Sequence, residues 1–267
     1  MTIDGSINKE YNPDNLREIF GMKKYFIAYF YILGFEDIVN KGDRFKDLKL
    51  LHTIKDIINN SRMMTSYFKK VDNLKEIQFK VFSDNFLYCT EENYIALISL
   101  VSCLQSAFIT SNLVIRGSLC HGDLLFDNEF LYGKGLIDAY KIESEIAIFP
   151  RIIIDESFLI EANKITSQIY KKELTYNEFL DTFNEYFFID FDGNKYINYL
   201  GVMDNLNIHN SDNSYEFIDV LKDHAKTIKI GLQSSDKRIL QKYQWCRTYH
   251  NKICKQYQQD KLIIELE

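Results

Sequence analysis

Residues 25–35 (YFIAYFYILGF) form an almost unbroken apolar stretch, and this stretch constrains the fold more than any other feature of the sequence. A strand that is covered on both faces is apolar throughout, whereas a strand with one solvated face alternates apolar and polar residues. The stretch is also too short to cross a membrane as a helix, which takes about 20 apolar residues. It therefore predicts a central strand in a sheet that other elements cover on both sides.

The composition is that of an ordinary globular protein, with 46% hydrophobic and 26% charged residues among 267. Lysine and arginine total 32 against 38 acidic residues, so the net charge is −6. An acidic chain is poorly suited to long nucleic acids, whose binding needs clustered positive charge. The first residues lack the apolar segment of a secretion signal. We therefore expect a cytoplasmic protein with no DNA and no membrane partner. Its five cysteines show no CxxC spacing, so we expect them to be reduced thiols packed in the protein.

The remaining pattern up to residue 155 predicts alternating strands and helices. Helical spacing covers 36–68, and the turn-forming residues 83–85 divide 77–89 into two strands. Further elements are a helix over 94–109, a strand over 113–120, a helix ending near 147 and a short strand over 151–155. This order predicts an α+β fold in which helices pack on a mixed sheet.

After residue 155 the pattern becomes mostly helical. Helices are expected over 174–187, 220–231 and 236–255, and a hairpin over 186–200 with its turn at Asp192-Gly193. We expect this part to be an extension that packs on the sheet or serves as a dimer arm. The predicted organisation is a leader over 1–22 with a short helix near 15–21, a main domain over 23–155 and the hairpin and helical extension over 156–267.

Three segments are informative when they are taken together and in this order: residues 31–35 (YILGF), 80–84 (KVFSD) and 116–143. Taken alone, Asp84 at a hairpin tip is explained by the preference of aspartate for turns. Together the segments resemble the class III nucleotidyl cyclases, and most of all the compact pyrimidine cyclases of Pycsar anti-phage defence. The resemblance covers roughly residues 24–255. Its further matches are Arg116-Gly117, Gly122, Tyr132-Gly133, Ala139, Ile142-Glu143, Phe149-Pro150-Arg151-Ile152 and segments 196–200, 242–245 and 249–251.

The resemblance implies a ferredoxin-like, cyclase-type α+β fold with a site shared between two copies in a head-to-tail homodimer. It implies that a nucleoside triphosphate is converted to a 3′,5′-cyclic nucleotide, here a pyrimidine one, with Mn²⁺ or Mg²⁺. It further implies that a separate effector responds to the cyclic product.

Two aspartates normally hold the two metal ions in this family, and the ions activate the attacking oxygen and neutralise the phosphates. Asp84 matches the second aspartate, and the backbone carbonyl of Ile32 matches a further ligand. The first aspartate falls on Tyr31, whose phenol has a pKa of about 10 and does not replace a bridging carboxylate. The replacement of this one aspartate by Tyr31 therefore argues against two-metal catalysis.

Four acidic residues are candidate substitutes for the missing carboxylate. Glu36 and Asp37 follow Tyr31 at a distance of about 15–20 Å unless the chain folds back after it. Asp123 or Asp127 can approach from neighbouring strands, but nothing in the pattern requires it.

The resemblance assigns nucleotide contacts to Lys80, Phe82, Arg116 and Tyr132. Lys80 stands where purine-specific relatives read the base, although a strand lysine can equally point to solvent. Arg116 can pair with a phosphate or with an internal carboxylate such as Glu143.

A catalytic contact to phosphate is implied for Lys141, as a point charge in place of the family's arginine. The family's transition-state asparagine falls on Ile137, which donates no hydrogen bond. Residues 133–135 (GKG) before a helix suit either a phosphate cradle or a simple strand-to-helix turn. Two hypotheses remain: an active nucleotide cyclase, or a catalytically degenerate homologue that binds nucleotide or regulates a partner.

Overall fold

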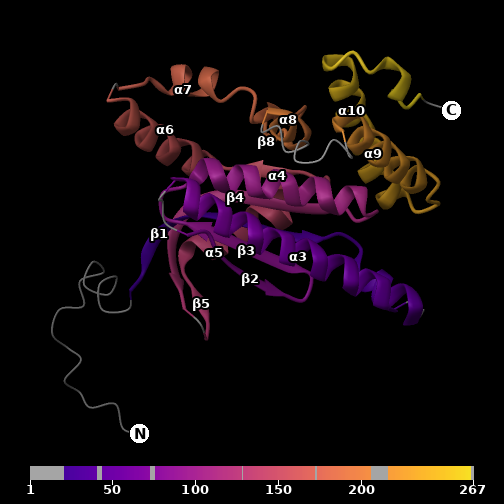
Figure 1. The fold of residues 1–267 in the computed structure, drawn as a ribbon, viewed down its shortest axis with the longest axis horizontal. Coiled ribbons are helices and arrows are strands. Elements are labelled where there is room, and N and C mark those ends of the chain that lie inside the picture. Colours follow the sequence, from indigo (N-terminus) through magenta and orange to yellow (C-terminus); the bar gives the residue numbers. More distant parts are fainter. Residues whose placement is uncertain are drawn as a thin grey trace, which may run out of the picture.

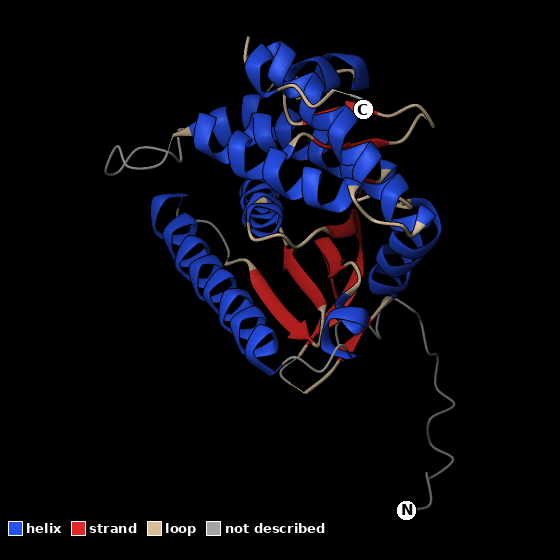
Figure 2. Ribbon diagram, turned by 90° about the vertical axis from the view of Figure 1, so that its right-hand side faces the viewer, coloured by secondary structure: helices blue, strands red, loops and turns tan. Residues whose placement is uncertain are grey.

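A computed structural model of the chain describes residues 21–40, 44–72, 76–127, 129–171, 173–205 and 216–265. Nearly all of the leader expected over 1–22, with its short helix, lies outside these residues. The described chain is an α+β fold in which helices lie on both sides of a mixed sheet (Figures 1 and 2). None of the described helices is long and apolar enough to cross a membrane.

The apolar stretch forms β1 (Lys23–Ile32), which lies inside the sheet as predicted. It pairs antiparallel with β3 (Asn85–Thr90) on one side and β4 (Ile115–Phe126) on the other. The strand order is β2-β3-β1-β4-β6-β8-β7, and β5 pairs with the far end of β4. The other strands are β2 (Gln78–Phe82), β5 (Leu131–Tyr132), β6 (Ile152–Ile154), β7 (Phe187–Ile189) and β8 (Lys195–Ile197).

The first half of the chain has ferredoxin-like topology. Its order is strand, helix, two strands, helix, strand, and these strands lie in the order β2-β3-β1-β4. The helices of this unit are α3 (Arg44–Asp72) and α4 (Tyr94–Thr110), and a short α2 (Phe35–Asn40) precedes them. The fold class predicted from the sequence is confirmed.

One face of the sheet is packed with aromatic side chains. The ring of Phe30 on β1 lies edge-on to that of Phe108 on α4, at 6.5 Å between centroids. Phe26 makes a similar contact of 4.9 Å with Phe158 on α6 (Glu156–Tyr170). Such pairs add about 0.5–1.5 kcal/mol each beyond the apolar area they bury. The even-numbered residues of β1 therefore anchor the sheet to α4 and α6.

The opposite face carries α5 (Lys134–Lys141), which crosses β1 and β4 and continues into a π-helical turn, η2 (Ile142–Ile146). The crossing is close, because a Cβ on Gly122 of β4 would lie 2.8 Å from the Cα of Gly135. The Ser118 hydroxyl donates to the Ala139 carbonyl at 2.7 Å. These contacts fix α5 over the odd-numbered residues of β1.

The extension also contributes to the sheet. The predicted hairpin is present as β7 and β8, and β8 pairs with β6, so the sheet continues beyond residue 155. A domain boundary at that residue stays a prediction. Arg151, just before β6, is fully buried and pairs with Asp190 and Asp192 beside the hairpin turn. Trp245 Nε1 donates to the same Asp190 at 2.7 Å and thereby joins the hairpin to the last long helix.

Two details of the extension differ from the sequence prediction. The pattern assigned no element to residues 156–173, where the structure has α6. The helix expected over 174–187 is shorter, because residue 187 already belongs to β7. The remaining helices are α7 (Tyr176–Thr182), α8 (Tyr199–Asn205), α9 (Phe217–Leu232), α10 (Lys237–Gln256) and η3 (Asp260–Leu262).

Candidate functional site

Strand register brings the key residues into one row on the face that carries α5. Tyr31 on β1 lies directly opposite Asn85 on β3 and Arg116 on β4. Residues that are directly opposite in antiparallel strands point to the same face of the sheet. Asp84 occupies the turn just before Asn85, and its carbonyl accepts a hydrogen bond from the Ile32 amide at 3.1 Å. The hairpin tip and the end of β1 are therefore side by side.

An ion pair lies against Tyr31. The Arg116 guanidinium carbon is 5.0 Å from the centre of the Tyr31 ring, and Arg116 Nε is 2.7 Å from Glu143 Oε1. The side chains of Arg116 and Glu143 are only 16% and 4% exposed. Burial raises the pKa of Glu143, and Arg116 offsets this only in part. Of the two partners considered for Arg116, the structure therefore shows the internal carboxylate.

The residues at this place do not fit a pair of divalent ions. Burial raises the pKa of Tyr31 further above its usual value, so the phenol stays neutral at physiological pH. Mg²⁺ and Mn²⁺ prefer carboxylate oxygens, and of the two matched positions only Asp84 supplies one. The Arg116 guanidinium adds a positive charge at the position where the sequence resemblance predicted metal ions. No cluster of three or more acidic, histidine or cysteine side chains suited to a metal occurs in the described residues.

The acids considered as substitutes lie elsewhere or are engaged. Asp123 pairs in register with Lys24, seven residues along β4 from Arg116, which is about 23 Å of strand. The side chain of Asp127 accepts a hydrogen bond from the Glu129 amide at 2.9 Å. Glu36 and Asp37 both lie in the first turn of α2. Asp123 and Asp127 thus do not replace the missing carboxylate.

A cavity of about 540 Å³ lies between the β2–β3 hairpin and α5, and we call it the hairpin cavity. Its lining is mostly apolar and includes Lys80, Phe82 and Leu87 from the hairpin and Leu136 and Tyr140 from α5. Cavities of this size and character commonly hold small organic ligands. Two of the predicted nucleotide-binding residues, Lys80 and Phe82, therefore line one cavity.

Tyr29 connects this cavity to the ion pair. It lies two residues before Tyr31 on the same face of β1 and lines the hairpin cavity. Its hydroxyl donates to Asn85 Oδ1 at 2.6 Å, and its ring lies 6.2 Å from that of Tyr140. Burial raises the pKa of Tyr29 to about 12, and the nearby charge of Glu143 adds to the shift. One wall of the cavity therefore continues along β1 from Tyr29 to Tyr31 and the ion pair.

The predicted nucleotide contacts differ in their surroundings. The Lys80 ammonium donates to the Asp127 carbonyl and lies 5.4 Å from the centre of the Phe126 ring. It is therefore held at the cavity wall and does not extend freely into solvent. Phe82 is 80% exposed at the rim. Tyr132 is 63% exposed on β5 and is not part of the lining.

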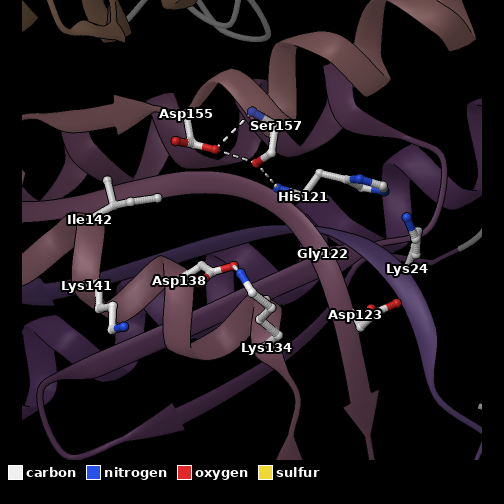
Figure 3. Close-up of a pocket in the computed structure, with 11 residues that line it drawn as sticks. Lys24, His121, Gly122, Asp123, Lys134, Asp138, Lys141, Ile142, Asp155 and Ser157 are labelled. Atoms are coloured by element: carbon white, nitrogen blue, oxygen red, sulfur yellow. Dashed lines mark hydrogen bonds and ion pairs between the residues drawn. The ribbon is translucent and has the colours of Figure 1, made fainter. Parts of the chain in front are cut away.

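Lys141 faces a different cavity on the other side of α5. This polar cavity, of about 490 Å³, is lined by Lys141, Lys24, His121 and Asp155 among others (Figure 3). Helical geometry explains the separation, because residues 134, 138 and 141 share one side of α5 while 136, 137 and 140 share the opposite side. The structure thus separates Lys141 from the hairpin cavity, whereas Ile137 lines that cavity.

The segment 133–135 forms a strand-to-helix turn at the start of α5. Gly133 stands at the N-cap position of this helix with a φ of 154°. Lys134 pairs with Asp138 at 2.5 Å, so its charge is offset within the helix (Figure 3). A Cβ on Gly133 would lie 2.2 Å from the Asp123 carbonyl oxygen, which accounts for the glycine by close packing.

Sequence reasoning missed Tyr29, Asn85 and the α5 side chains Leu136 and Tyr140 as parts of the site. One signal was available, since Tyr29 is two residues from Tyr31 and a strand points every second residue to the same face. The α5 residues depend on how that helix crosses the sheet, which no local pattern indicates.

Comparison with known proteins gives little further information. No protein family model and no curated protein matches the sequence. Among solved structures, a class III adenylyl cyclase-like ATP-binding protein from Pseudomonas aeruginosa is similar, with 16% identity and a TM-score of 0.38. The match covers 60% of this chain and 40% of that one.

Proposed function

We propose that this protein binds a nucleoside triphosphate in the hairpin cavity and does not cyclise it. One observation carries the proposal: the Arg116–Glu143 ion pair stacks on Tyr31 beside a ligand-sized cavity, at the place where the resemblance puts the metal-binding aspartates. The site has a cavity large enough for a nucleotide base but lacks the second carboxylate that two-metal catalysis needs.

The cavity suits a planar base. Aromatic side chains from both walls, Phe82 and Tyr140, offer faces for stacking, and such contacts with a base contribute about 1–3 kcal/mol each. Tyr29 and Asn85 supply polar groups at the inner end, where a base or ribose needs hydrogen bonds. Lys80 adds a positive charge at the wall.

The absence of turnover follows from the charges. Cyclisation requires that the ribose 3′-oxygen loses its proton and that pyrophosphate leaves with its negative charge neutralised. In relatives two metal ions do both. Here Tyr31 is a neutral phenol, and Glu143 already offsets the charge of Arg116.

A second candidate is an active cyclase that makes a 3′,5′-cyclic pyrimidine nucleotide for a separate Pycsar-type effector. It is favoured by the position of Asp84, which the hydrogen bond from the Ile32 amide holds beside the end of β1. This candidate needs Mn²⁺ or Mg²⁺ bound by Asp84 with fewer protein ligands than usual.

The two candidates are separated by one pair of measurements. The purified protein is titrated with each of the four ribonucleoside triphosphates by calorimetry, and the same mixtures with Mn²⁺ are analysed for pyrophosphate and cyclic product. We expect saturable binding and no product. Product from any triphosphate would favour the cyclase, and absence of binding to all of them would refute the proposal.

A matched pair of variants locates the binding. Phe82→Ala removes an exposed ring from the cavity rim, and we expect about a fivefold to tenfold weaker affinity. Phe191→Ala removes a ring of similar exposure, 77% against 80%, that does not line the cavity. Equal affinities for the two variants would place the ligand elsewhere.

We further propose a homodimer that covers the rim of the cavity. Large apolar side chains are exposed there: Phe82, Phe130, Tyr132, Ile137 and Tyr140 are each more than half exposed. Exposed apolar groups that cluster in this way mark interaction surfaces. Analytical ultracentrifugation is expected to show a dimer that Ile137→Asp converts to a monomer, and a monomeric unsubstituted protein would contradict this.

A further inference from the structure

Two buried histidines in the helical extension contact each other. His224 lies on α9 and His250 on α10, and both are fully buried. Their Nδ1 atoms are 2.9 Å apart. The outer nitrogens are also engaged, because His224 Nε2 lies 2.5 Å from the Tyr199 hydroxyl and His250 Nε2 lies 2.9 Å from the Leu262 carbonyl oxygen. The two rings are thus the middle of a chain of three hydrogen bonds that joins α8, α9, α10 and η3.

The Leu262 carbonyl determines where the hydrogens of this chain lie. A carbonyl oxygen only accepts, so His250 Nε2 carries a hydrogen, and Nδ1 of the neutral ring is then an acceptor. His224 therefore donates from Nδ1 and accepts at Nε2, where the Tyr199 hydroxyl donates. The Cys254 sulfur, 3.3 Å from His250 Nε2, is a weak acceptor and does not change this order. All four ring nitrogens are satisfied when both histidines are neutral.

One additional proton disrupts this order. The contact between the two Nδ1 atoms holds only one hydrogen, and His250 Nε2 already carries another. The extra hydrogen must therefore sit on His224 Nε2, where it faces the Tyr199 hydroxyl. That hydroxyl then has no acceptor for its own hydrogen among the described residues. A buried hydroxyl without an acceptor and a buried positive charge are both unfavourable.

The groups nearest the rings do not favour a positive charge. Burial lowers the pKa of His224, and the charge of His250 lowers it further. Burial also lowers the pKa of His250; the hydrogen bond to Leu262 offsets this in part, and Lys229 on α9 lowers the pKa again. Among the described residues, no carboxylate contacts either ring. The pair is therefore neutral at pH 7.

The other ionisable groups on the neighbouring elements do not supply a balancing negative charge. Burial holds the pKa values of the Tyr199 and Tyr249 phenols well above 10. Burial and then the charge of Asp260 raise the pKa of the Cys254 thiol to about 11. The helix α4 packs against α8 and α9, and its only ionisable side chains, Tyr94 and Cys103, have pKa values raised by burial.

Residues 260–265, which we call the C-terminal segment, cover His250 through Leu262. The segment is also held by Asn251 on α10, whose side-chain amide donates to the Ile264 carbonyl and accepts from the Ile264 amide, both at 2.9 Å. Ile264 is the only buried residue of the segment. A segment with so few buried contacts opens at a lower cost than the packed helices do. Its opening removes the Leu262 carbonyl from His250 and gives the ring access to water.

We propose that the His224–His250 pair is a pH switch that holds the C-terminal segment on α10 at neutral pH and releases it in acid. When the pair takes up a proton, the segment detaches, and water solvates the charged His250 ring in place of the Leu262 carbonyl. Histidine pairs are suited to this role because their charge changes close to physiological pH. The switch does not depend on nucleotide binding.

The pH dependence has a definite sign and size. A histidine that is exposed to water has a pKa of about 6.5, whereas the closed pair binds the proton less well. The open form is therefore favoured increasingly as the pH falls below that value. When the closed pair stays neutral, one exposed histidine raises the ratio of open to closed molecules about tenfold between pH 7.5 and 5.5.

Hydrogen exchange followed by mass spectrometry measures this opening in the full chain. Exchange is recorded at pH 7.5 and 5.5 and corrected for the intrinsic effect of pH on amide exchange, while circular dichroism monitors folding. We expect opening of the C-terminal segment to increase about tenfold at pH 5.5 and exchange in α4 to stay unchanged. An unchanged segment would overturn the proposal. An equal increase throughout the chain would overturn it as well, because it would show global unfolding.

Variants assign the response to the buried pair. His250→Gln keeps a donor for the Leu262 carbonyl but does not titrate, so the segment should stay closed at both pH values. His52→Gln is the control, because His52 is an exposed histidine that pairs with Asp56 on α3, and this variant should keep the tenfold response. If His250→Gln does not fold, His224→Asn takes its place, since its amide keeps a donor near the Nδ1 position. A full response in the variant of the pair that folds would overturn the proposal.

Discussion

Replacing Arg151 by methionine should destabilise the protein far more than the loss of an exposed charged residue would. The side chain is fully buried, and its guanidinium pairs with Asp190 and Asp192 of the β7–β8 turn. Methionine fills much of the volume but leaves both carboxylates without their cation. Removing one partner of a buried pair costs about 3–5 kcal/mol, because the other partner stays desolvated.

The surroundings of Asp190 and Asp192 put the expected loss in free energy of unfolding near the lower end of that range. Asp190 is 11% exposed and keeps a hydrogen bond from Trp245 Nε1, while the side chain of Asp192 is 29% exposed and gains water. We therefore expect a loss of about 3 kcal/mol, which lowers the melting temperature of a chain of this size by about 6–12 °C. Urea denaturation followed by circular dichroism measures the free energy directly.

A matched control is present in the same hairpin. Lys195 on β8 lies 3.7 Å from Glu156, whose side chain is 56% exposed. Lys195→Met breaks this solvated pair and should cost less than about 1 kcal/mol. Equal losses for the two methionine variants would refute the argument that burial makes Arg151 important.

Acid unfolding offers an independent check on the same network. Burial raises the pKa of Asp192, but its hydrogen bonds to Arg151 and Asn194 outweigh this and bring the pKa down to about 2. The ordinary value is 3.8, so the stabilisation is present above that pH and is lost as the pH falls toward 2. Solvent screening at this exposed residue limits the effect to less than about 1 kcal/mol. Arg151→Met should show a smaller loss over the same pH window.

Three further predictions concern packing and protonation. Phe86→Ala, at a fully buried ring, should cost about 3–5 kcal/mol in urea denaturation, whereas Phe82→Ala, at an exposed ring of the same hairpin, should cost less than about 0.5 kcal/mol. Gly122→Ala should cost about 1–3 kcal/mol, since its Cβ would lie 2.8 Å from the backbone of α5. Burial and then the charge of His250 hold the pKa of His224 well below 6.5, so stability should fall as the pH drops below that value, and the fall in melting temperature should be smaller in His224→Gln.

The strands of the first half could be predicted because their signals are local. A continuous apolar run identifies β1, and turn formers identify the β2–β3 hairpin, where Ser83 adopts a left-handed conformation with a φ of 56°. The helix α6 gave no such signal. Its buried positions are Phe158, Leu159, Ala162 and Thr166, a narrow stripe of which an alanine and a polar residue make up half.

Pairing between distant strands could not be predicted in the same way. The parallel alignment of β6 with β4 and the addition of β8 depend on contacts such as the buried Arg151 with Asp190. The sequence contains these charges but not their mutual distance. The hairpin of the extension was therefore predicted, while its membership of the main sheet was not.

The candidate site shows the same limit more sharply. Along the sequence, Tyr31 is a missing metal ligand, and Arg116 can pair with a phosphate or with an internal carboxylate. The register of β1 with β4 places Arg116 opposite Tyr31, and the turn of the chain after α5 brings in Glu143. Because of these two long-range contacts, Tyr31 is more than a missing carboxylate: its ring packs against the Arg116 guanidinium. Two divalent ions would bring four positive charges, whereas Arg116 brings one, which Glu143 offsets. That balance does not neutralise a departing pyrophosphate, so the proposed binding without turnover is the outcome that the charges favour.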